Sequence, residues 1–117
     1  MKRGDVVLVD LLYTDRTASK VRPALVVQAD DLNRQLTNTI VAVITSSQRR
    51  NVGAASQLSI DISTEEGRQT GLATPSVLQC ENLVAVGNSF VFRKVGRFSD
   101  RLMQQVNKWR WGLTAER

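Results

Sequence analysis

The chain has 117 residues, 16 lysines and arginines against 11 aspartates and glutamates, one cysteine and no histidine, with a sequence pI near 10.1. This length suits one domain, residues 1–117. The missing histidines exclude Ser–His and Cys–His nucleophile systems and histidine metal ligands, and Cys80 alone excludes an internal disulfide and a structural zinc site.

The first half of the chain predicts three strands. Residues 4–12 and 23–29 are apolar segments rich in β-branched and aliphatic residues, and a polar loop separates them. Because proline cannot donate to a central ladder, Pro23 is expected to be the first residue of the second strand. A short helical turn is expected over residues 30–34 and a third strand over 38–45.

The second half predicts further strands. Polar and apolar residues alternate over 57–62, which is typical of a half-buried strand. A long loop is expected over residues 65–75. More strands are expected at 76–80, 83–86 and 90–95. The longest apolar runs are strand-sized and no secretory signal opens the chain, so we expect a cytoplasmic protein without a membrane segment.

The last segment predicts a helix. Ser99 suits the N-cap, Asp100 lies where the helix dipole favours an anion, and Gly112 is expected to stop the helix. The apolar residues at helical spacing are Leu102, Met103, Val106, Trp109 and Leu113. Trp111 lies off this stripe and is free to serve a partner. The whole pattern indicates a small all-β barrel or curled sheet closed by a C-terminal helix.

Polar side chains gather at three of the expected strand ends. They are Lys20 and Arg22 before the second strand, Thr45, Ser46, Ser47 and Gln48 after the third, and Gln79 and Glu81 on either side of Cys80. If these ends lie on one rim, they form a site with an arginine, hydroxyl groups and a carboxylate. The arginine-rich positive charge of the chain, 12 of 16 cations, favours a polyanionic partner.

Such a site suits cleavage of RNA through its own 2′-hydroxyl. A base takes the 2′ proton, a cation stabilises the phosphorane and a donor protonates the leaving 5′-oxygen, so no metal is needed. Each residue also has a simpler interpretation. Arg22 could be a solvated arginine, Thr45 to Ser47 could be a turn, and Glu81 could be a surface carboxylate paired with an arginine. Arg49 and Arg50 could be a solvated loop tip.

Taken together, these residues resemble the MazF/PemK toxins, the endoribonuclease half of type II toxin–antitoxin pairs. The resemblance rests on the order and spacing of KRGDVV at 2–7, KVRPALVV at 20–27, DLN at 31–33, VITS at 43–46, GL at 71–72 with SVL at 76–78, and VGRFS at 95–99. It implies a mainly β fold, an SH3-like barrel (the MazF/CcdB-like toxin fold) with a C-terminal helix. It also implies a homodimer and metal- and cofactor-independent cleavage of single-stranded mRNA. The implied protein partner is a cognate acidic antitoxin whose flexible tail covers the active site.

The resemblance assigns roles unevenly. The arginine before proline and the threonine that closes the third strand are implicated in catalysis in the family, and they match Arg22 and Thr45. Some members carry a catalytic Arg-x-Asp motif where this chain has Gln79 and Glu81, so the carboxylate is kept and the cation is lost. We therefore expect Arg22, Thr45 and Glu81 to be catalytic. We expect RNA to contact Lys20, Ser46, Ser47, Gln48, Arg49, Arg50 and Gln79, with no metal ligand.

Two other functions remain open from the sequence. Toxins that resemble CcdB poison gyrase, share this fold and depend on a C-terminal Trp-Gly followed by an apolar residue, which Trp111-Gly112-Leu113 imitates. The third function is that of an inactive paralogue that only binds antitoxin. Cleavage of RNA would indicate the endoribonuclease, and inhibition of supercoiling would indicate the gyrase poison. The absence of both activities would favour the inactive paralogue.

Overall fold

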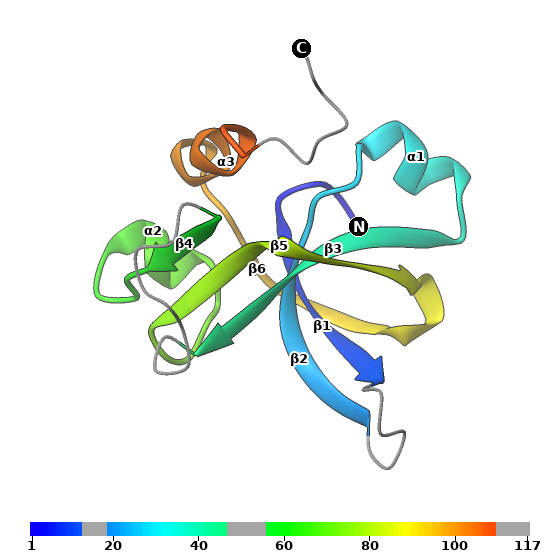
Figure 1. Ribbon diagram of the computed structural model, residues 1–117, viewed down its shortest axis with the longest axis horizontal. Helices are drawn as coiled ribbons and strands as arrows, with labels where there is room; N and C mark the ends of the chain where they lie inside the picture. Colours follow the sequence, from blue (N-terminus) through cyan, green and yellow to red (C-terminus); the bar gives the residue numbers. More distant parts are fainter. Residues whose placement is uncertain (13–18, 47–55, 110–117) are drawn as a thin grey trace.

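The computed structural model describes residues 1–12, 19–46 and 56–109 of the chain. Within them, six strands form one antiparallel sheet in the order β4-β5-β3-β2-β1-β6, which curls strongly (Figure 1). The strands are β1 (Asp5–Leu12), β2 (Ser19–Val26), β3 (Asn38–Ser46), β4 (Gln57–Ile60), β5 (Ser76–Gly87) and β6 (Val91–Arg97). The helices are α1 (Asp30–Gln35), α2 (Glu65–Gln69), α3 (Asp100–Asn107) and the 3-10 turn η2 (Asn88–Phe90).

The two faces of the curled sheet bury different apolar clusters. One face packs against α3, and Phe98, Leu102, Met103 and Val106 from the helix end of the chain meet strand residues such as Leu25 and Ile44. The other face lines the inside of the curl and is rich in valine: Val7, Val9, Leu11, Ala24, Val26, Val41, Val43 and Val86. Because successive strand residues alternate between faces, this double burial explains the near-continuous apolar runs of β1 and β3.

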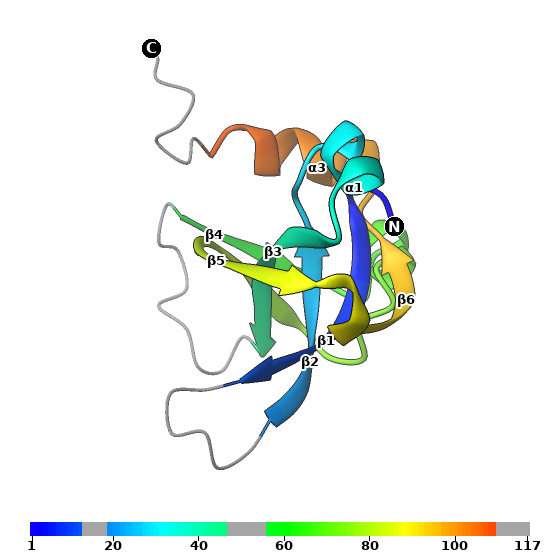
Figure 2. The same ribbon diagram turned by 90° about the vertical axis from the view of Figure 1, so that its right-hand side faces the viewer.

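Helix α3 lies across one end of the sheet, on the same side of the molecule as α1 (Figures 1 and 2). Ser99 is its N-cap, as predicted, because its hydroxyl accepts a hydrogen bond from the Leu102 N–H at 3.1 Å. Leu102, Met103 and Val106 are buried as the apolar spacing indicated, and the partly buried Trp109 packs against the same cluster. The mainly β class with a C-terminal helix is therefore confirmed.

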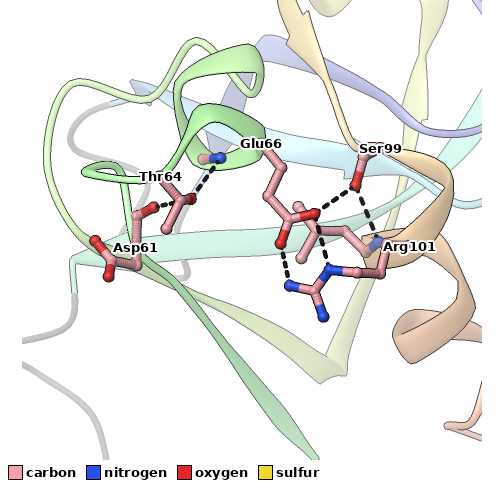
Figure 3. Close-up of polar contacts among 7 residues, drawn as sticks. Asp61, Thr64, Glu66, Ser99 and Arg101 are labelled. Atoms are coloured by element: carbon pink, nitrogen blue, oxygen red, sulfur yellow. Dashed lines mark hydrogen bonds and ion pairs between the residues drawn. The ribbon is translucent and has the colours of Figure 1, made fainter.

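Helix α2 is tied to the start of α3 by one carboxylate (Figure 3). Glu66 accepts hydrogen bonds from the Ser99 hydroxyl at 2.9 Å and from the Arg101 Nε at 3.1 Å, and it forms an ion pair with the same guanidinium. The Thr64 hydroxyl caps α2 by accepting from the Gly67 N–H at 3.0 Å. This network fixes the α2 segment, which leads directly into the loop before β5.

Several predicted boundaries are wrong. Pro23 lies inside β2, whose pairing with β1 begins at Ser19. Pairing of β2 with β3 begins only at Ala24, so the missing N–H of proline falls where this ladder has not started. The loop expected over residues 65–75 contains α2, which begins at the capping residue Thr64.

Two further corrections concern the C-terminal half. Residues 76–80 and 83–86 belong to one long strand, β5, which carries a register shift opposite Ala42 and Val43 instead of a break. Helix α3 ends at Asn107, before Gly112, and residues 110–117 lie outside the described part of the chain. No helix among the described residues is long and apolar enough to span a membrane.

Candidate functional site

Arg22 and Thr45 lie two residues beyond the last paired positions of β2 and β3. The paired positions of β2 and β3 end at Ala24 and Val43. Continuing this register sets Pro23 opposite Ile44 and Arg22 opposite Thr45. Residues that face each other on neighbouring antiparallel strands share one face of the sheet, so Arg22 and Thr45 project to the same side. The predicted association of these two residues is therefore supported by the topology.

Both side chains lie at the rim of the valine-rich face. Arg22 and Thr45 are half-buried, whereas Ala24 and Val43, the next residues on the same face, belong to the apolar cluster inside the curl. The Thr45 hydroxyl donates to the carbonyl of Ser46 at 3.1 Å. Its oxygen keeps lone pairs, and its proton turns toward a ligand without a change of backbone. The same pocket therefore contains a hydroxyl and a cation.

Gln79 lies on the same face, one step farther along the sheet. It is opposite Val43 on β3 and opposite Gln57 on β4. Thr45 is itself opposite Val77, so Gln79 is displaced from Thr45 by roughly 7 Å along the strands. The Gln79 side chain is buried, and its amide oxygen accepts from the Asn82 amide at 3.1 Å. This hydrogen bond fixes the orientation of the Gln79 amide.

Glu81 lies farther along β5 and is exposed. Its Oε2 accepts a hydrogen bond from the Gln57 Nε2 at 3.3 Å, which holds the carboxylate beside the strand pair that carries Gln79. The structure therefore orders Arg22, Thr45, Gln79 and Glu81 across β2, β3 and β5. The expectation that Gln79 and Glu81 stand at the end of their strand is wrong. They lie in the middle of β5, because this strand starts at Ser76, which pairs with Ser46 at the end of β3, and continues to Gly87.

The remaining predicted residues are placed less completely. Ser46 ends β3, and Lys20 lies in β2 at the position paired with Leu11. Ser47, Gln48, Arg49 and Arg50 lie outside the described residues, as does the first loop, residues 13–18.

Cys80 takes no part as a nucleophile. It is buried in the cluster beneath α3. Burial, and to a smaller extent the charge of Glu81, raises the pKa of the Cys80 thiol to about 11. The thiol is therefore protonated at neutral pH, and thiolate chemistry is not accessible to it. Within residues 1–12, 19–46 and 56–109, no three histidine, cysteine, aspartate or glutamate side chains gather closely enough to hold a metal ion.

A pocket of about 370 Å³ opens beside Arg22 and Thr45, where β2 and β3 are no longer paired. Its lining comprises Leu8, Arg22, Pro23, Ile44, Thr45, Ser46, Gly71, Leu72, Ala73, Thr74, Ser76, Arg93 and Val95. Arg93 is opposite Leu8, which is in turn opposite Pro23, so Arg93 shares the Pro23 face of the sheet. Reasoning from the sequence missed Arg93, because nothing in the sequence indicates that β6 pairs with β1.

Two glycines hold the wall of this pocket against β6. Gly71 has a φ of +77°, and a Cβ there would lie 2.2 Å from the Val95 carbonyl oxygen. A Cβ on Gly96 would lie 2.4 Å from the Gln69 and Thr70 backbone. Only glycine permits this approach of two backbones. The segment that follows, Leu72 to Thr74, is thus set rigidly over the pocket.

Comparison with known proteins gives a consistent picture. Residues 2–109 match the model of the family described as PemK-like, MazF-like toxin of type II toxin–antitoxin system. No curated protein matches the chain. A solved structure of the Mycobacterium tuberculosis toxin MazF-mt6 is similar, with 25% sequence identity and a TM-score of 0.69, over 89% of this chain and 89% of that one.

Two similar structures contain a partner. An endoribonuclease in complex with its cognate antitoxin from Mycobacterial species has 19% identity and a TM-score of 0.71, over 92% of this chain and 87% of that one. A MazE–MazF structure from Deinococcus radiodurans has 14% identity and a TM-score of 0.70, over 92% of this chain and 89% of that one. At these identities the likeness concerns the fold.

Proposed function

The chain belongs to the family of PemK-like, MazF-like toxins of type II toxin–antitoxin systems, and we propose that it is an endoribonuclease that cleaves single-stranded RNA without a metal ion. The observation that carries the proposal is that Arg22 and Thr45 line the same pocket, just beyond the paired positions of β2 and β3. A cation beside a hydroxyl donor suits a phosphodiester whose negative charge increases in the transition state.

In the proposed reaction the 2′-hydroxyl of the RNA is the nucleophile. It loses its proton and attacks the adjacent phosphorus, the bond to the 5′-oxygen breaks, and the leaving oxygen takes a proton from water. The products are a 2′,3′-cyclic phosphate and a 5′-hydroxyl. Arg22 stabilises the charge on the non-bridging oxygens, and the Thr45 hydroxyl donates a second hydrogen bond to them.

Glu81 is proposed to accept the proton of the 2′-hydroxyl or to position the group that accepts it. No histidine exists to take this role, and the hydrogen bond from Gln57 fixes the Glu81 carboxylate on the β4–β5 side of the site. Gln79 lies between Glu81 and Thr45 along the strands, where its amide can position the nucleotide. Lys20 and residues 46–50 are proposed to contact the same RNA.

The proposed protein partner is an acidic antitoxin that competes with RNA. Arginines that hold phosphate also attract carboxylates, so one surface serves both ligands. Two of the similar structures contain an antitoxin. A titration of a protein–RNA complex with the acidic antitoxin segment should release RNA. A stable ternary complex with RNA still at Arg22 would contradict the shared surface.

We also propose that the protein is a cytoplasmic homodimer. Ile40 and Leu83 are exposed although apolar, and the register of β3 and β5 places them on one face of the sheet, since Ile40 is opposite Ala85 and Ala42 opposite Leu83. Adjacent exposed apolar side chains favour association. The mass of the protein in solution by light scattering tests this part of the proposal.

The test of the activity is incubation of the purified protein with mixed-sequence RNA in EDTA, followed by mapping of the ends. Cleavage at short preferred sequences is the expected result. Loss of cleavage in EDTA that magnesium restores would contradict the metal-independent reaction. Inhibition of gyrase supercoiling without RNA cleavage would assign the chain to the gyrase-poison class, and the absence of both activities would leave an antitoxin-binding paralogue.

A further inference from the structure

The pocket that contains Arg93 has the chemistry of a nucleotide site, and the proposed reaction gives Arg93 no role. Arg22 and Thr45 contribute to its lining, so it adjoins the proposed catalytic residues. The rest of its lining comes from two other places. One is the face of the sheet that carries Pro23, opposite to the face that carries Arg22 and Thr45, and the other is the loop after α2. Its volume of about 370 Å³ lies within the range of small-ligand sites, roughly 300–1,000 Å³.

The charge of the pocket favours an anion. Its two charged lining residues, Arg22 and Arg93, are both cations, and no carboxylate lines it among the described residues. The guanidinium of Arg93 is exposed and makes no hydrogen bond or ion pair with the described residues. Its five donors are therefore available to a phosphate, which arginine binds in a bidentate way.

The rest of the lining suits a base and a sugar. Leu8, Pro23 and Val95 supply apolar surface. The Ser76 hydroxyl donates to the Thr74 carbonyl at 2.8 Å, which leaves the Ser76 oxygen as an acceptor. The close backbone contacts at Gly71 and Gly96 hold the covering loop in place. A preformed pocket loses less freedom when a ligand binds.

We propose that this pocket binds the nucleotide of the single-stranded RNA next to the cleaved bond, with its phosphate on Arg93 and its base against the Leu8–Pro23 surface. The inference rests on the proposed function and extends it. It makes Arg93 a substrate-binding residue that determines which base is accepted beside the cut. An acidic side chain of a protein partner is the competing occupant, and the experiment separates the two.

The experiment measures binding of a fluorescent 2′-O-methyl RNA of mixed sequence, which lacks the attacking 2′-hydroxyl and is not cleaved. Arg93→Ala should weaken binding about tenfold. It should also reduce the salt dependence, log Kd against log salt, by about 0.7, the loss of one phosphate contact to a single strand. Arg93→Lys should keep the salt dependence. Arg97→Ala is the matched control, because Arg97 is an exposed arginine of the same strand that does not line the pocket.

A second arm tests the base. Ala73→Phe should fill the pocket and change the preferred base beside the cut in a randomised RNA pool, whereas Ala73→Ser should not. Circular dichroism of each variant confirms that it folds.

Unchanged RNA affinity and salt dependence in Arg93→Ala would overturn the inference. If Arg93→Ala lost binding to an acidic peptide but still bound RNA, the inference would also be overturned, because the occupant of the pocket would be a protein. If the wild type binds 2′-O-methyl RNA as predicted but cleaves no RNA, the proposed function fails and the pocket assignment stands. If the wild type cleaves RNA and Arg93→Ala behaves like wild type in both assays, only the pocket assignment fails.

Discussion

Arg22 of β2 and Thr45 of β3 line the same pocket just beyond the last paired positions of their strands, Ala24 and Val43. The pairing stops where Pro23 removes a backbone donor, and the two strands then diverge beside an open pocket. Arg22 and Thr45 therefore lie at the boundary between the apolar face of the sheet and a polar site. The predictions below test what this arrangement does.

Arg22→Ala should reduce RNA cleavage by about 10²–10³-fold, by analogy with the removal of one donor that stabilises a developing anion. The side chain is not part of either apolar cluster, and circular dichroism should show that the variant folds. Arg34→Ala is the matched control, because Arg34 is an exposed arginine of α1 that forms an ion pair with Asp31. Near-full activity of Arg22→Ala at the same cut sites would remove Arg22 from the reaction.

Thr45→Ser should keep most of the activity, and Thr45→Ala should lose roughly tenfold, because only the hydroxyl is needed to donate one hydrogen bond. Rates are compared under single-turnover conditions, so that binding and chemistry are separated. Equal rates for the serine and alanine variants would show that the methyl group or the backbone matters, and not the hydroxyl.

Glu81→Gln should remove the acidic limb of the pH–rate profile, since the amide keeps the shape of the side chain but cannot accept the 2′ proton. The hydrogen bond that Gln57 donates to Glu81 can also go to the amide oxygen of the variant. Glu65→Gln, an exposed carboxylate of α2, is the control. A profile that keeps its acidic limb in Glu81→Gln would assign the proton to another group or to water.

Gly71→Ala should destabilise the protein by about 1–3 kcal/mol or more, because its Cβ meets the Val95 carbonyl oxygen and its φ is +77°. Gly87→Ala is the matched control. Gly87 has a φ of −65°, and its Cβ would meet only the Phe90 ring at 3.4 Å. Chemical denaturation should show a large difference between the two variants. Equal stabilities would mean that the loop over the pocket is not held by this contact.

The Glu66 contacts in Figure 3 predict a pH-dependent part of the stability. The hydrogen bonds from Arg101 and then Ser99 lower the pKa of Glu66 below its ordinary value of 4.5. A carboxylate whose pKa is lower in the folded state stabilises the protein above about pH 4.5 and loses that contribution as the pH falls through the folded value. Glu66→Gln should flatten this acid limb of the stability curve, and Glu65→Gln should not. Parallel acid limbs in wild type and Glu66→Gln would contradict the role of the contact.

Local patterns were sufficient for most elements of the fold. Alternation and β-branched content located the strands, and Ser99 located the start of α3, because both signals act within a few residues. The predicted start of β2 at Pro23 was wrong. A proline disrupts a strand only on the side where a neighbouring strand is paired, and β3 is not yet paired at Pro23. The α2 turn was missed because its five residues are too few for a helical period.

The candidate site was only partly predictable for a similar reason. Arg22 and Thr45 stand beside recognisable strand ends, and their proximity follows from neighbouring strands that pair in sequence order. Arg93 lies at the pocket because β6 pairs with β1, and these strands come from opposite ends of the sequence. No local pattern contains that pairing. The same holds for Gln57, whose contact with Glu81 depends on the β4–β5 register.

The central claim is that Arg22 and Thr45 support metal-independent attack by the 2′-hydroxyl of RNA. The most direct test is mass spectrometry of the fragments from a defined RNA oligonucleotide cleaved in EDTA, with wild type and Arg22→Ala side by side. We predict fragments that carry a 2′,3′-cyclic phosphate and a 5′-hydroxyl from the wild type, and almost none from Arg22→Ala. Fragments with a 3′-hydroxyl and a 5′-phosphate, or cleavage by the wild type only after magnesium is added, would contradict the account.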